Sequence, residues 1–322
     1  MSKPKIIATR KLPFAVEKRL REIFTVALNP SDTPFDDAKL ITALKHADGV
    51  IATFGDDLNA AVMQAGGSGK AQIIANFGVG VNHIDLNAAA QNNIVVTNTP
   101  GVLTDATADI TMALILNATR RTYEHETALR SGNWKGFDLV SGLGMALQDK
   151  TLAILGMGRI GQAVAMRAYF GFGMKIAYYN RSKVENLPVP GAQAMDTIED
   201  LMEIADVLTI HVPGGEENQN IVSRSRLNLM KNTAYLVNTA RGDVVDQMAL
   251  SEALRDGMIA GAGLDVFADE PNIPAALLAL KNVSLFPHIG SATLDARNAM
   301  GMCAVENLIA HFQGQVPPNK LG

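Results

Sequence analysis

A glycine-rich stretch in the middle of the chain, Thr151 to Gly161, constrains the fold more than any other feature. Its sequence is TLAILGMGRIG: five mostly apolar, strand-forming residues lead into Gly156, Gly158 and Gly161, and the following QAVAMRAYF has helical spacing. A strand, a tight turn and a helix start in this order form the dinucleotide-binding fingerprint. The first glycine permits the sharp turn, the second lets a pyrophosphate approach the backbone, and the third lets helix and strand pack closely. The stretch therefore predicts that a dinucleotide binds here, with its pyrophosphate on the helix N–H groups.

Short apolar runs alternate with helical segments on both sides of this fingerprint. The candidate strands are residues 5–9, 24–28, 49–53, 72–76 and 94–97, and then 151–155, 175–179, 207–211, 234–238, 261–266 and 283–286. Strands that alternate with helices predict parallel sheets covered on both faces. We therefore expect an α/β protein with two doubly wound parallel-sheet domains, a flavodoxin-like substrate domain followed by a Rossmann dinucleotide-binding domain.

The domain boundaries follow from turn residues and from two long helical segments. The turn NTPG at 98–101 marks the first crossing between domains. A helix from about Thr104 to Ser131 follows, and its first half is apolar almost all round, as expected between domains or in a subunit interface. The last helix, about Ala292 to Gln313, is extra to a six-stranded Rossmann fold. We expect a substrate domain at residues 1–100, completed by the C-terminal helix in 291–322, and a dinucleotide-binding domain at 101–290.

Composition excludes several classes of protein. The 322 residues are 48% apolar and 19% charged with a net charge of −4, so no basic surface indicates nucleic acid. No stretch reaches 18 uninterrupted apolar residues and no secretory leader is recognisable. The single cysteine, Cys303, cannot form an internal disulfide, and no Cys/His cluster has zinc spacing. We expect a cytoplasmic protein with a small-molecule partner, no membrane or nucleic-acid partner and no metal.

The end of the second Rossmann strand reads Asn180, Arg181, Ser182. A domain selective for NAD normally carries Asp or Glu here, which accepts hydrogen bonds from the ribose 2′-OH. Arg181 and Ser182 instead offer donors that suit a 2′-phosphate. The sequence predicts NADP as the preferred cofactor and NAD as the alternative. The competing interpretation is an arginine that is solvated in a loop.

Three ionisable residues follow later strands at the same predicted edge of the sheet. They are Arg241 in NTARGDVVD, Glu270 in DVFADEP and His288 in FPHIGSAT. Hydride transfer to a 2-keto acid needs a cation for the carboxylate and carbonyl, which suits Arg241, and an acid for the new alkoxide, which suits His288. Glu270 would orient the imidazole. Each residue alone is more often a surface or capping residue, so their joint occurrence carries the hypothesis.

The order of GMGRIG, NTARGDVVD, GLDVFADEP and FPHIGSAT resembles the D-isomer-specific 2-hydroxyacid dehydrogenases over essentially the whole chain. Within that family, SGNWKGF (131–137) and FADEPNI are similar to the glyoxylate/hydroxypyruvate reductases and glycerate dehydrogenases. The resemblance implies reduction of glyoxylate or hydroxypyruvate to glycolate or D-glycerate, with Arg241, Glu270 and His288 as the catalytic residues. It implies cofactor contacts at Thr107, His211, Val212, Pro213, Thr239, Ala240, Arg241, Asp265, His288 and Gly290. The fingerprint itself predicts contacts at Gly156, Gly158, Arg159, Ile160 and Gly161. The contacts expected at Asn180, Arg181 and Ser182 stand where the chain departs from the family consensus, since many members have an acid there.

Substrate contacts are expected in the first domain and on one arm. The resemblance implies that backbone N–H groups of Val79 and Gly80, in FGVGVNHID, bind the substrate carboxylate; a glycine-flanked backbone nest is also a reasonable anion site in its own right. Phe54 follows the third strand and should limit substrate size. Trp134 either reaches the partner subunit's active site, as in similar enzymes, or is a plain aromatic of a dimer interface. We expect a homodimer.

Two alternatives stay open at this point. One is a dehydrogenase of the same fold that oxidises an inorganic or one-carbon anion such as phosphite or formate; Glu270 disfavours formate, whose dehydrogenases lack this partner of the histidine. The other is a nucleotide-sensing module without turnover, like the corepressors that share the fold. The complete set of Arg241, Glu270 and His288 disfavours this second alternative.

Overall fold

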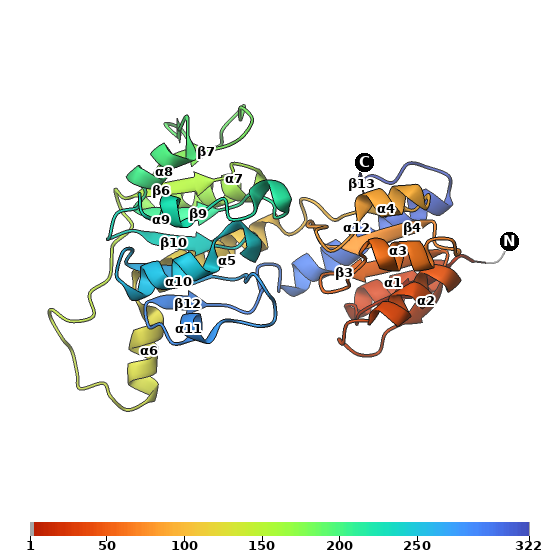
Figure 1. Ribbon diagram of the computed structural model, residues 1–322, viewed down its shortest axis with the longest axis horizontal. Helices are drawn as coiled ribbons and strands as arrows, with labels where there is room; N and C mark the ends of the chain where they lie inside the picture. The colour runs from red at the N-terminus through yellow and green to blue at the C-terminus, as the bar shows by residue number, and fades with distance from the viewer. Residues whose placement is uncertain (1–2, 322) are drawn as a thin grey trace. The chain divides into compact units, whose positions relative to one another are not determined.

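The computed structural model describes residues 3–321 (Figure 1). The chain divides into two compact units, unit 1 from residues 1–103 and 291–322, and unit 2 from residues 104–290. The boundaries expected from the sequence lie at 100/101 and 290/291. Only unit 2 is therefore continuous in the sequence.

Unit 1 is a sheet of five parallel strands with one antiparallel strand at its edge. The strands are β1 (Lys5–Ala8), β2 (Thr25–Leu28), β3 (Gly49–Thr53), β4 (Ile73–Phe77), β5 (Val95–Thr97) and β13 (Lys320–Leu321). Their order is β13-β5-β4-β3-β1-β2, in which β1 to β5 have the flavodoxin-like arrangement and β13 is antiparallel to β5. The helices are α1 (Phe14–Ile23), α2 (Asp37–His46), α3 (Ala60–Gly66), α4 (Leu86–Gln91) and α12 (Leu294–Phe312). One core cluster joins α1 and α12 to the sheet, and another joins α2, α3 and α4 to it.

Unit 2 is a parallel sheet of seven strands. The strands are β6 (Thr151–Leu155), β7 (Lys175–Tyr179), β8 (Gln193–Ala194), β9 (Val207–Ile210), β10 (Tyr235–Asn238), β11 (Gly261–Leu264) and β12 (Val283–Leu285), in the order β12-β11-β10-β9-β6-β7-β8. The helices are α5 (Thr104–Thr119), α6 (Thr122–Arg130), α7 (Arg159–Met166), α8 (Ile198–Ile204), α9 (Arg224–Leu227), α10 (Gln247–Arg255) and α11 (Ala275–Leu278). A π-helical turn (Arg167–Gly171) and two 3-10 turns, η2 (Glu216–Asn218) and η3 (Gly242–Val244), complete the unit. One core cluster contains residues of α5 and α7, and the other contains residues of α8 to α11.

This architecture confirms the predicted fold class, two doubly wound parallel-sheet domains of which the second is of Rossmann type. The strand β6 is followed on one side by β7 and β8 and on the other by β9, so the direction of winding reverses between β6 and β9. Ligands of such sheets bind beyond the carboxyl ends of the strands at this reversal. The fingerprint glycines follow β6 at this point.

The long helix predicted from Thr104 to Ser131 is wrong. Helix α5 ends at Thr119, Arg121 has a left-handed φ of 52°, and α6 begins at Thr122. The guanidinium of Arg121 pairs with Glu124 in the first turn of α6, at 2.7 Å. The buried side chains of α5 pack within the core of unit 2 against its sheet and α7. The apolar side chains of α5 are therefore explained by packing within unit 2.

Two short strands lack a signal in the sequence. The six strands predicted for the Rossmann domain do not include β8, which is the third strand of unit 2 along the chain and lies at one edge of the sheet. They do include β12, the seventh strand, at the other edge. No strand was predicted after the last helix, but Lys320 and Leu321 pair with Thr97 and Val96 of β5. Both strands are two residues long, too short for an alternating pattern.

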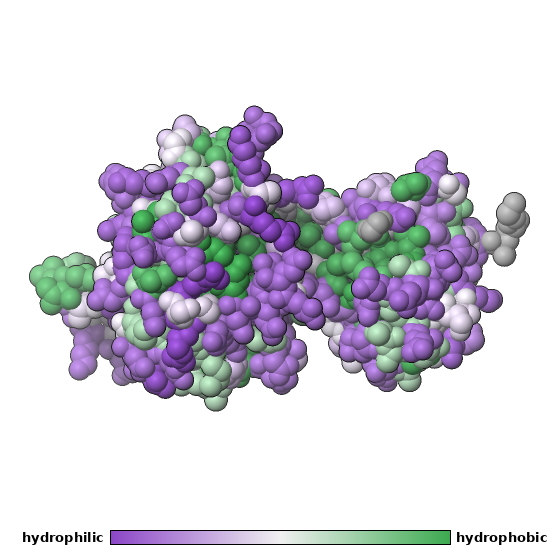
Figure 2. Space-filling view, turned by 45° about the horizontal axis from the view of Figure 1, so that its top comes forward, coloured by the Kyte–Doolittle hydropathy of each residue, from purple (hydrophilic) through white to green (hydrophobic). Residues whose placement is uncertain are grey.

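A segment between α6 and β6 projects from unit 2 and carries exposed apolar side chains. In Figure 1 it is the yellow-green loop beyond α6, and hydrophobic side chains gather at its outer end in Figure 2. The exposed residues on this segment are Trp134, Phe137, Leu139, Val140 and Leu143. The His125 ring of α6 is 2.9 Å from the Gly142 carbonyl oxygen, and this contact holds the returning chain against the helix.

Among residues 3–321, no helix is long and apolar enough to cross a membrane. Within the same residues, no His, Cys, Asp and Glu side chains form a group of three or more that could hold a metal ion.

Candidate functional site

The fingerprint turn has the geometry that its three glycines predict. Gly156 has a φ of 100°, and a Cβ at this residue would lie 2.8 Å from the backbone carbon of His211. A Cβ at Gly161 would lie 2.3 Å from the Gly156 carbonyl oxygen. At Gly158 a Cβ would meet nothing within 4 Å, so the open side of the turn is above this residue. Arg159 and Ile160 begin helix α7 directly after it. The turn therefore has room for a pyrophosphate where the fingerprint requires it.

At the end of β7, Asn180 holds two loops together. Its Oδ1 accepts a hydrogen bond from Met157 N in the fingerprint turn at 3.1 Å, and its Nδ2 donates to the Ser182 carbonyl oxygen at 2.8 Å. The guanidinium of Arg181 is 84% exposed and forms an ion pair with Glu217 at 2.7 Å. The side chain of Asn180 thus fixes the loop, while Arg181 extends from it.

Glu270 and His288 come together after strands β11 and β12. Glu270 Oε2 lies 2.7 Å from His288 Nδ1, and Glu270 Oε1 accepts a hydrogen bond from Phe267 N at 2.9 Å. Both oxygens of the carboxylate are therefore engaged, which fixes its orientation. His288 has a left-handed φ of 53°, and its N–H donates to the Asp265 carbonyl oxygen at 2.9 Å. The imidazole is thus held through both its side chain and its backbone.

Arg241 follows β10, the strand next to β11 in the sheet. Its Nη1 donates to the Ala240 carbonyl oxygen at 2.6 Å. Burial lowers the pKa of this guanidinium, while the carboxylates of Glu270 and Asp243 act in the opposite direction. A side chain of this type stays charged at neutral pH. The structure thus gathers Arg241, Glu270 and His288 at the carboxyl ends of three adjacent strands.

Asp265 supports the turn that carries His288. Its two carboxylate oxygens accept hydrogen bonds from Ile289 N at 2.7 Å and from Gly290 N at 2.8 Å. Burial raises the pKa of this carboxyl, and the two backbone N–H groups oppose that shift. A Cβ at Gly290 would lie 3.1 Å from Asp265 and 3.5 Å from Thr107, so these residues are neighbours. Both oxygens of Asp265 serve the protein backbone.

The remaining predicted cofactor residues lie at the ends of β9 and β10. Thr239 Oγ1 is 2.9 Å from Thr111 Oγ1 of α5, and Ala240 N donates to Asn238 Oδ1. His211 Nε2 is 3.0 Å from Thr209 Oγ1, and burial lowers the pKa of the ring to about 3, so the imidazole is neutral. Val212 and Pro213 continue from His211 into a turn whose Gly215 N donates to Asp243. All these residues share the carboxyl edge of the unit 2 sheet.

In unit 1, the turn after β4 presents backbone N–H groups. Asn76 Nδ2 donates to the carbonyl oxygens of Gly78 and Gly80, both at 3.0 Å, and Asn98 Nδ2 donates to that of Val79. Within residues 3–321, no hydrogen bond is donated by Val79 N or Gly80 N. The carbonyl groups are thus satisfied while two successive N–H groups remain available, which is the arrangement of an anion-binding nest.

Phe54 and Trp134 are both largely exposed, in different units. Phe54 follows β3 and packs edge-to-face with His83, with ring centroids 6.1 Å apart. His83 Nε2 is 3.1 Å from Asn76 Oδ1, so Phe54 belongs to the same cluster of residues as the turn after β4. Trp134 is 64% exposed on the segment between α6 and β6.

Sequence reasoning missed several asparagines and one aspartate. Asn76 is the last residue but one of β4, and Asn238 is the last of β10. Asparagine is unfavourable in such apolar strands, and this conflict was a usable signal. Asp243 accepts a hydrogen bond from Gly215 N at 2.8 Å, and its Oδ1 is buried without a hydrogen-bond partner in the described structure. Glu217, the partner of Arg181, lies in a polar stretch that gave no signal.

Comparison with known proteins identifies the family. Residues 112–290 match the family model described as D-isomer specific 2-hydroxyacid dehydrogenase, NAD binding domain. A glyoxylate reductase of Thermococcus litoralis is 43% identical over 98% of this chain and 96% of its own length, and one of Korarchaeum cryptofilum is 42% identical over 98% and 95%. The structure of an NADPH-dependent glyoxylate/hydroxypyruvate reductase from Sinorhizobium meliloti, in complex with NADP and malonate, superposes with a TM-score of 0.88. That protein is 37% identical, and the match covers 100% of this chain and 97% of the other. The resemblance stated from the motifs is confirmed: this chain belongs to the D-isomer-specific 2-hydroxyacid dehydrogenase family and is an oxidoreductase with a nicotinamide dinucleotide cofactor.

Proposed function

We propose that this chain reduces small 2-keto acids, glyoxylate or hydroxypyruvate foremost, to glycolate or D-glycerate, and that it prefers NADPH. The observation that carries the proposal is the Glu270 carboxylate, fixed by Phe267 N and bonded to the His288 ring, with Arg241 after the neighbouring strand β10. The names of the relatives support the substrate class.

The roles of the three side chains follow from their chemistry. Arg241 binds the substrate carboxylate and polarises the keto oxygen, because a planar guanidinium can engage two oxygens together. His288 donates a proton to the alkoxide that forms, and we assign this proton to Nε2 because Glu270 engages Nδ1. Glu270 holds the imidazole ring in place through its bond to Nδ1. The bound nicotinamide supplies the hydride.

In the proposed reaction, unit 1 contributes to substrate binding. Val79 N and Gly80 N bind the substrate carboxylate, since their carbonyl groups are held by Asn76 and Asn98 and their N–H groups point to no protein acceptor among the described residues. Phe54 limits the length of the substrate side chain. Residues 1–100 with 291–322 are accordingly assigned as the substrate domain, and 101–290 as the NAD(P)-binding domain.

The preference for NADPH rests on the residues after β7. No acidic side chain is present at Asn180, Arg181 or Ser182 to bind a ribose 2′-OH. Arg181 and the Ser182 hydroxyl supply donors for a 2′-phosphate. The Sinorhizobium meliloti relative is named as NADPH-dependent and its structure contains NADP, which supports this choice. The remaining contacts proposed for the cofactor are those of Thr107, the glycine turn with Arg159 and Ile160, His211 to Pro213, Thr239 to Arg241, Asp265, His288 and Gly290.

A panel of 2-keto acids, each with NADH and NADPH, tests the proposal through the nicotinamide absorbance. Glyoxylate and hydroxypyruvate should give the highest kcat/KM, and NADPH should exceed NADH about tenfold or more, the value of one charge-assisted hydrogen bond. His288→Ala should lower kcat by about 10² to 10⁴. The exposed His46→Ala is the matched control. Turnover of His288→Ala near that of the control would refute the assignment, and oxidation of phosphite in place of keto-acid reduction would favour the alternative chemistry.

We further propose that the chain acts as a homodimer. The apolar residues on the segment between α6 and β6, with Phe137 91% exposed, are an extended surface that a second copy would cover. Light scattering of the purified protein tests this. If Trp134 reaches the active site of the partner subunit, Trp134→Ala should alter substrate preference; unaltered kinetics in a dimer of lower stability would instead assign it to the interface alone.

A further inference from the structure

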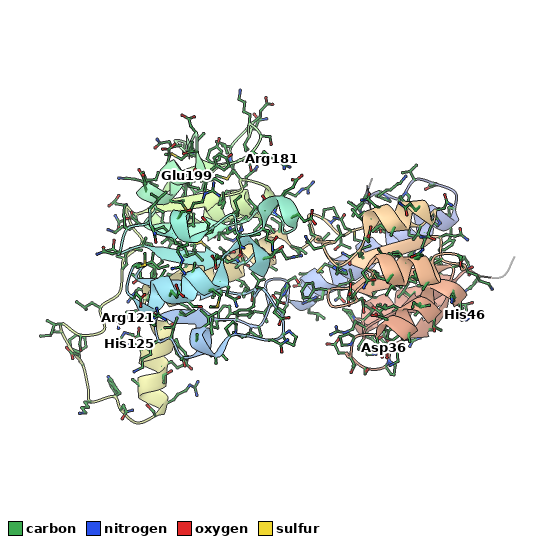
Figure 3. All side chains as sticks on the ribbon, viewed as in Figure 1. Asp36, His46, Arg121, His125, Arg181 and Glu199 are labelled. Atoms are coloured by element: carbon green, nitrogen blue, oxygen red, sulfur yellow. The ribbon has the colours of Figure 1, made fainter. Side chains whose placement is uncertain are left out.

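The ion pair between Arg181 and Glu217 connects two loops at the dinucleotide edge of unit 2. Arg181 follows β7, at the surface of the unit (Figure 3), and Glu217 lies in the turn η2 that follows β9. Strands β7 and β9 are the two neighbours of β6, which leads into the glycine turn. The Arg181 Nη1 and Glu217 Oε2 atoms are 2.7 Å apart. A carboxylate therefore lies directly against the side chain that we assign to the 2′-phosphate.

Both members of the pair are attached to anchored backbone. On one side, Asn180 bonds to Met157 N and to the Ser182 carbonyl oxygen. On the other side, Asn218 Nδ2 donates to the Pro213 carbonyl oxygen at 2.9 Å, and Gly215 N donates to Asp243 at 2.8 Å. The carboxylate of Glu217 is thus kept close to Arg181 by the fold, although its side chain is 79% exposed.

A 2′-phosphate and this carboxylate have charges of the same sign. A phosphate monoester carries about −1.5 to −2 charges at neutral pH, so it must share Arg181 with Glu217 or displace Glu217 from it. Displacement is feasible because an exposed ion pair contributes little to stability. The displaced carboxylate nevertheless remains near the phosphate and repels it. A cofactor with a plain 2′-OH leaves the pair intact.

We propose that Glu217 is a specificity-determining residue that competes with the 2′-phosphate for Arg181, and so limits the preference for NADP(H) over NAD(H). This inference rests on the proposed role of Arg181 in cofactor binding. It adds that cofactor selectivity depends on two loops: Arg181 after β7 favours the 2′-phosphate, and Glu217 after β9 opposes it.

The test compares Glu217→Gln with Glu216→Gln, its exposed neighbour, which removes the same charge one residue away. Dissociation constants of NADP⁺ and NAD⁺ are measured by titration calorimetry, and those of adenosine 2′,5′-bisphosphate and 5′-AMP by competition. We expect Glu217→Gln to lower the dissociation constants of NADP⁺ and the bisphosphate about two- to fivefold, the size of an exposed ion pair. The constants of NAD⁺ and 5′-AMP should stay nearly unchanged, and Glu216→Gln should have the smaller effect throughout. Thermal melts check that both variants are folded.

The inference is overturned if Glu217→Gln leaves NADP⁺ binding unchanged or weakens it, if Glu216→Gln has an equal effect, or if NAD⁺ binding tightens equally. Arg181→Ala separates this result from the proposed cofactor preference. If Arg181→Ala weakens NADP⁺ binding while Glu217→Gln has no effect, only the inference fails. Unchanged NADP⁺ binding in Arg181→Ala would remove the assigned phosphate ligand and the inference with it. Absence of keto-acid turnover would refute the proposed reaction and leave these binding comparisons valid.

Discussion

At the scale of single residues, Asp243 has an unusual position. One carboxylate oxygen accepts from Gly215 N, and the other is buried without a hydrogen-bond partner in residues 3–321. A Cβ at Gly214 would lie 2.6 Å from that second oxygen and 3.0 Å from Arg241 Cγ. The same carboxylate raises the pKa of Arg241, against the effect of burial. Asp243 therefore joins the turn after β9 to Arg241.

Replacing Asp243 should affect both stability and the site. Asp243→Ala leaves Gly215 N without its acceptor, so the free energy of unfolding should fall by about 1–3 kcal/mol. The turn from Pro213 to Gly215 should also loosen and weaken nucleotide binding. Denaturant unfolding and calorimetric titration measure the two effects. The exposed Asp256→Ala, which loses only the pair with Arg255, should change the free energy of unfolding by less than about 0.5 kcal/mol. An equal change in the free energy of unfolding for the two variants would show that the bond between Asp243 and Gly215 N does not stabilise the fold.

His211 makes the stability of the chain depend on pH. Burial lowers its folded-state pKa to about 3, while in the unfolded chain it has its ordinary value near 6.5. At pH values between about 3 and 6.5, His211 binds a proton in the unfolded state but not in the folded state. The free energy of unfolding therefore falls as the pH drops below about 6.5, and is not reduced by this residue above that pH. Its contribution to the slope is at most about 1.4 kcal/mol per pH unit.

Denaturant unfolding between pH 4.5 and 7.5 measures this dependence. His211→Gln should flatten the acid side of the profile relative to the unchanged chain. His46→Gln, at an exposed position of α2, should leave the profile as it was. An identical slope in all three proteins would show that His211 titrates as freely in the folded chain as in the unfolded one.

At the scale of secondary structure elements, the sequence predicted the strands that have an apolar run. It missed the helix break and the supporting contacts of the site, each of which depends on one or two residues. The eleven strands predicted from apolar runs are present, because strands of a parallel sheet that helices cover on both faces are rich in apolar residues. The break between α5 and α6 depends on one left-handed residue, Arg121, and the helical periodicity continues across it. In the candidate site, the motifs predicted which strand ends carry Arg241, Glu270 and His288. The supporting contacts of Asp243 with Gly215 and of Glu217 with Arg181 join segments far apart in the sequence, so no local pattern could predict them.

The strand, turn and helix around the fingerprint allow folding and binding to be separated. Gly158 has φ −77° and ψ −164°, values open to alanine, and a Cβ there meets nothing within 4 Å. Gly158→Ala should therefore keep or slightly raise the free energy of unfolding. Its methyl group should obstruct the pyrophosphate and weaken nucleotide binding. Gly161→Ala places a Cβ 2.3 Å from the Gly156 carbonyl oxygen and should destabilise the fold itself.

Thermal unfolding and NADP⁺ titration of both glycine variants distinguish the two roles. The expected result is a stable Gly158→Ala protein that binds poorly, and a Gly161→Ala protein with a lower Tm. Undiminished NADP⁺ affinity in Gly158→Ala would contradict the proposed approach of the pyrophosphate to this residue. An unchanged Tm in Gly161→Ala would contradict the close packing of α7 on β6.

At the scale of the whole molecule, one unit is formed by a single continuous part of the chain and the other by two separate parts. Unit 2 is continuous, and its core clusters contain only residues of 104–290. Unit 1 needs α12 from the other end of the chain: Met300, Val305 and Leu308 are buried in its core. A Cβ at Gly301 would lie 2.3 Å from Val16, so α12 and α1 pack closely. Asn307 also donates to the Asn98 carbonyl oxygen, and β13 extends the sheet beside β5.

This difference predicts how fragments of the chain behave. Burial of Met300, Val305 and Leu308 contributes about 5–9 kcal/mol, comparable with the whole stability of a typical domain, about 5–15 kcal/mol. The fragment 1–103 should therefore be unfolded, whereas 104–290 should unfold cooperatively and bind NADP⁺. Joining 1–103 to 291–322 through a flexible Gly/Ser linker should restore a folded unit 1 by returning α12 to its place. Circular dichroism and denaturant titration of the three proteins measure this, and a cooperative unfolding transition in 1–103 alone would show that unit 1 does not require α12.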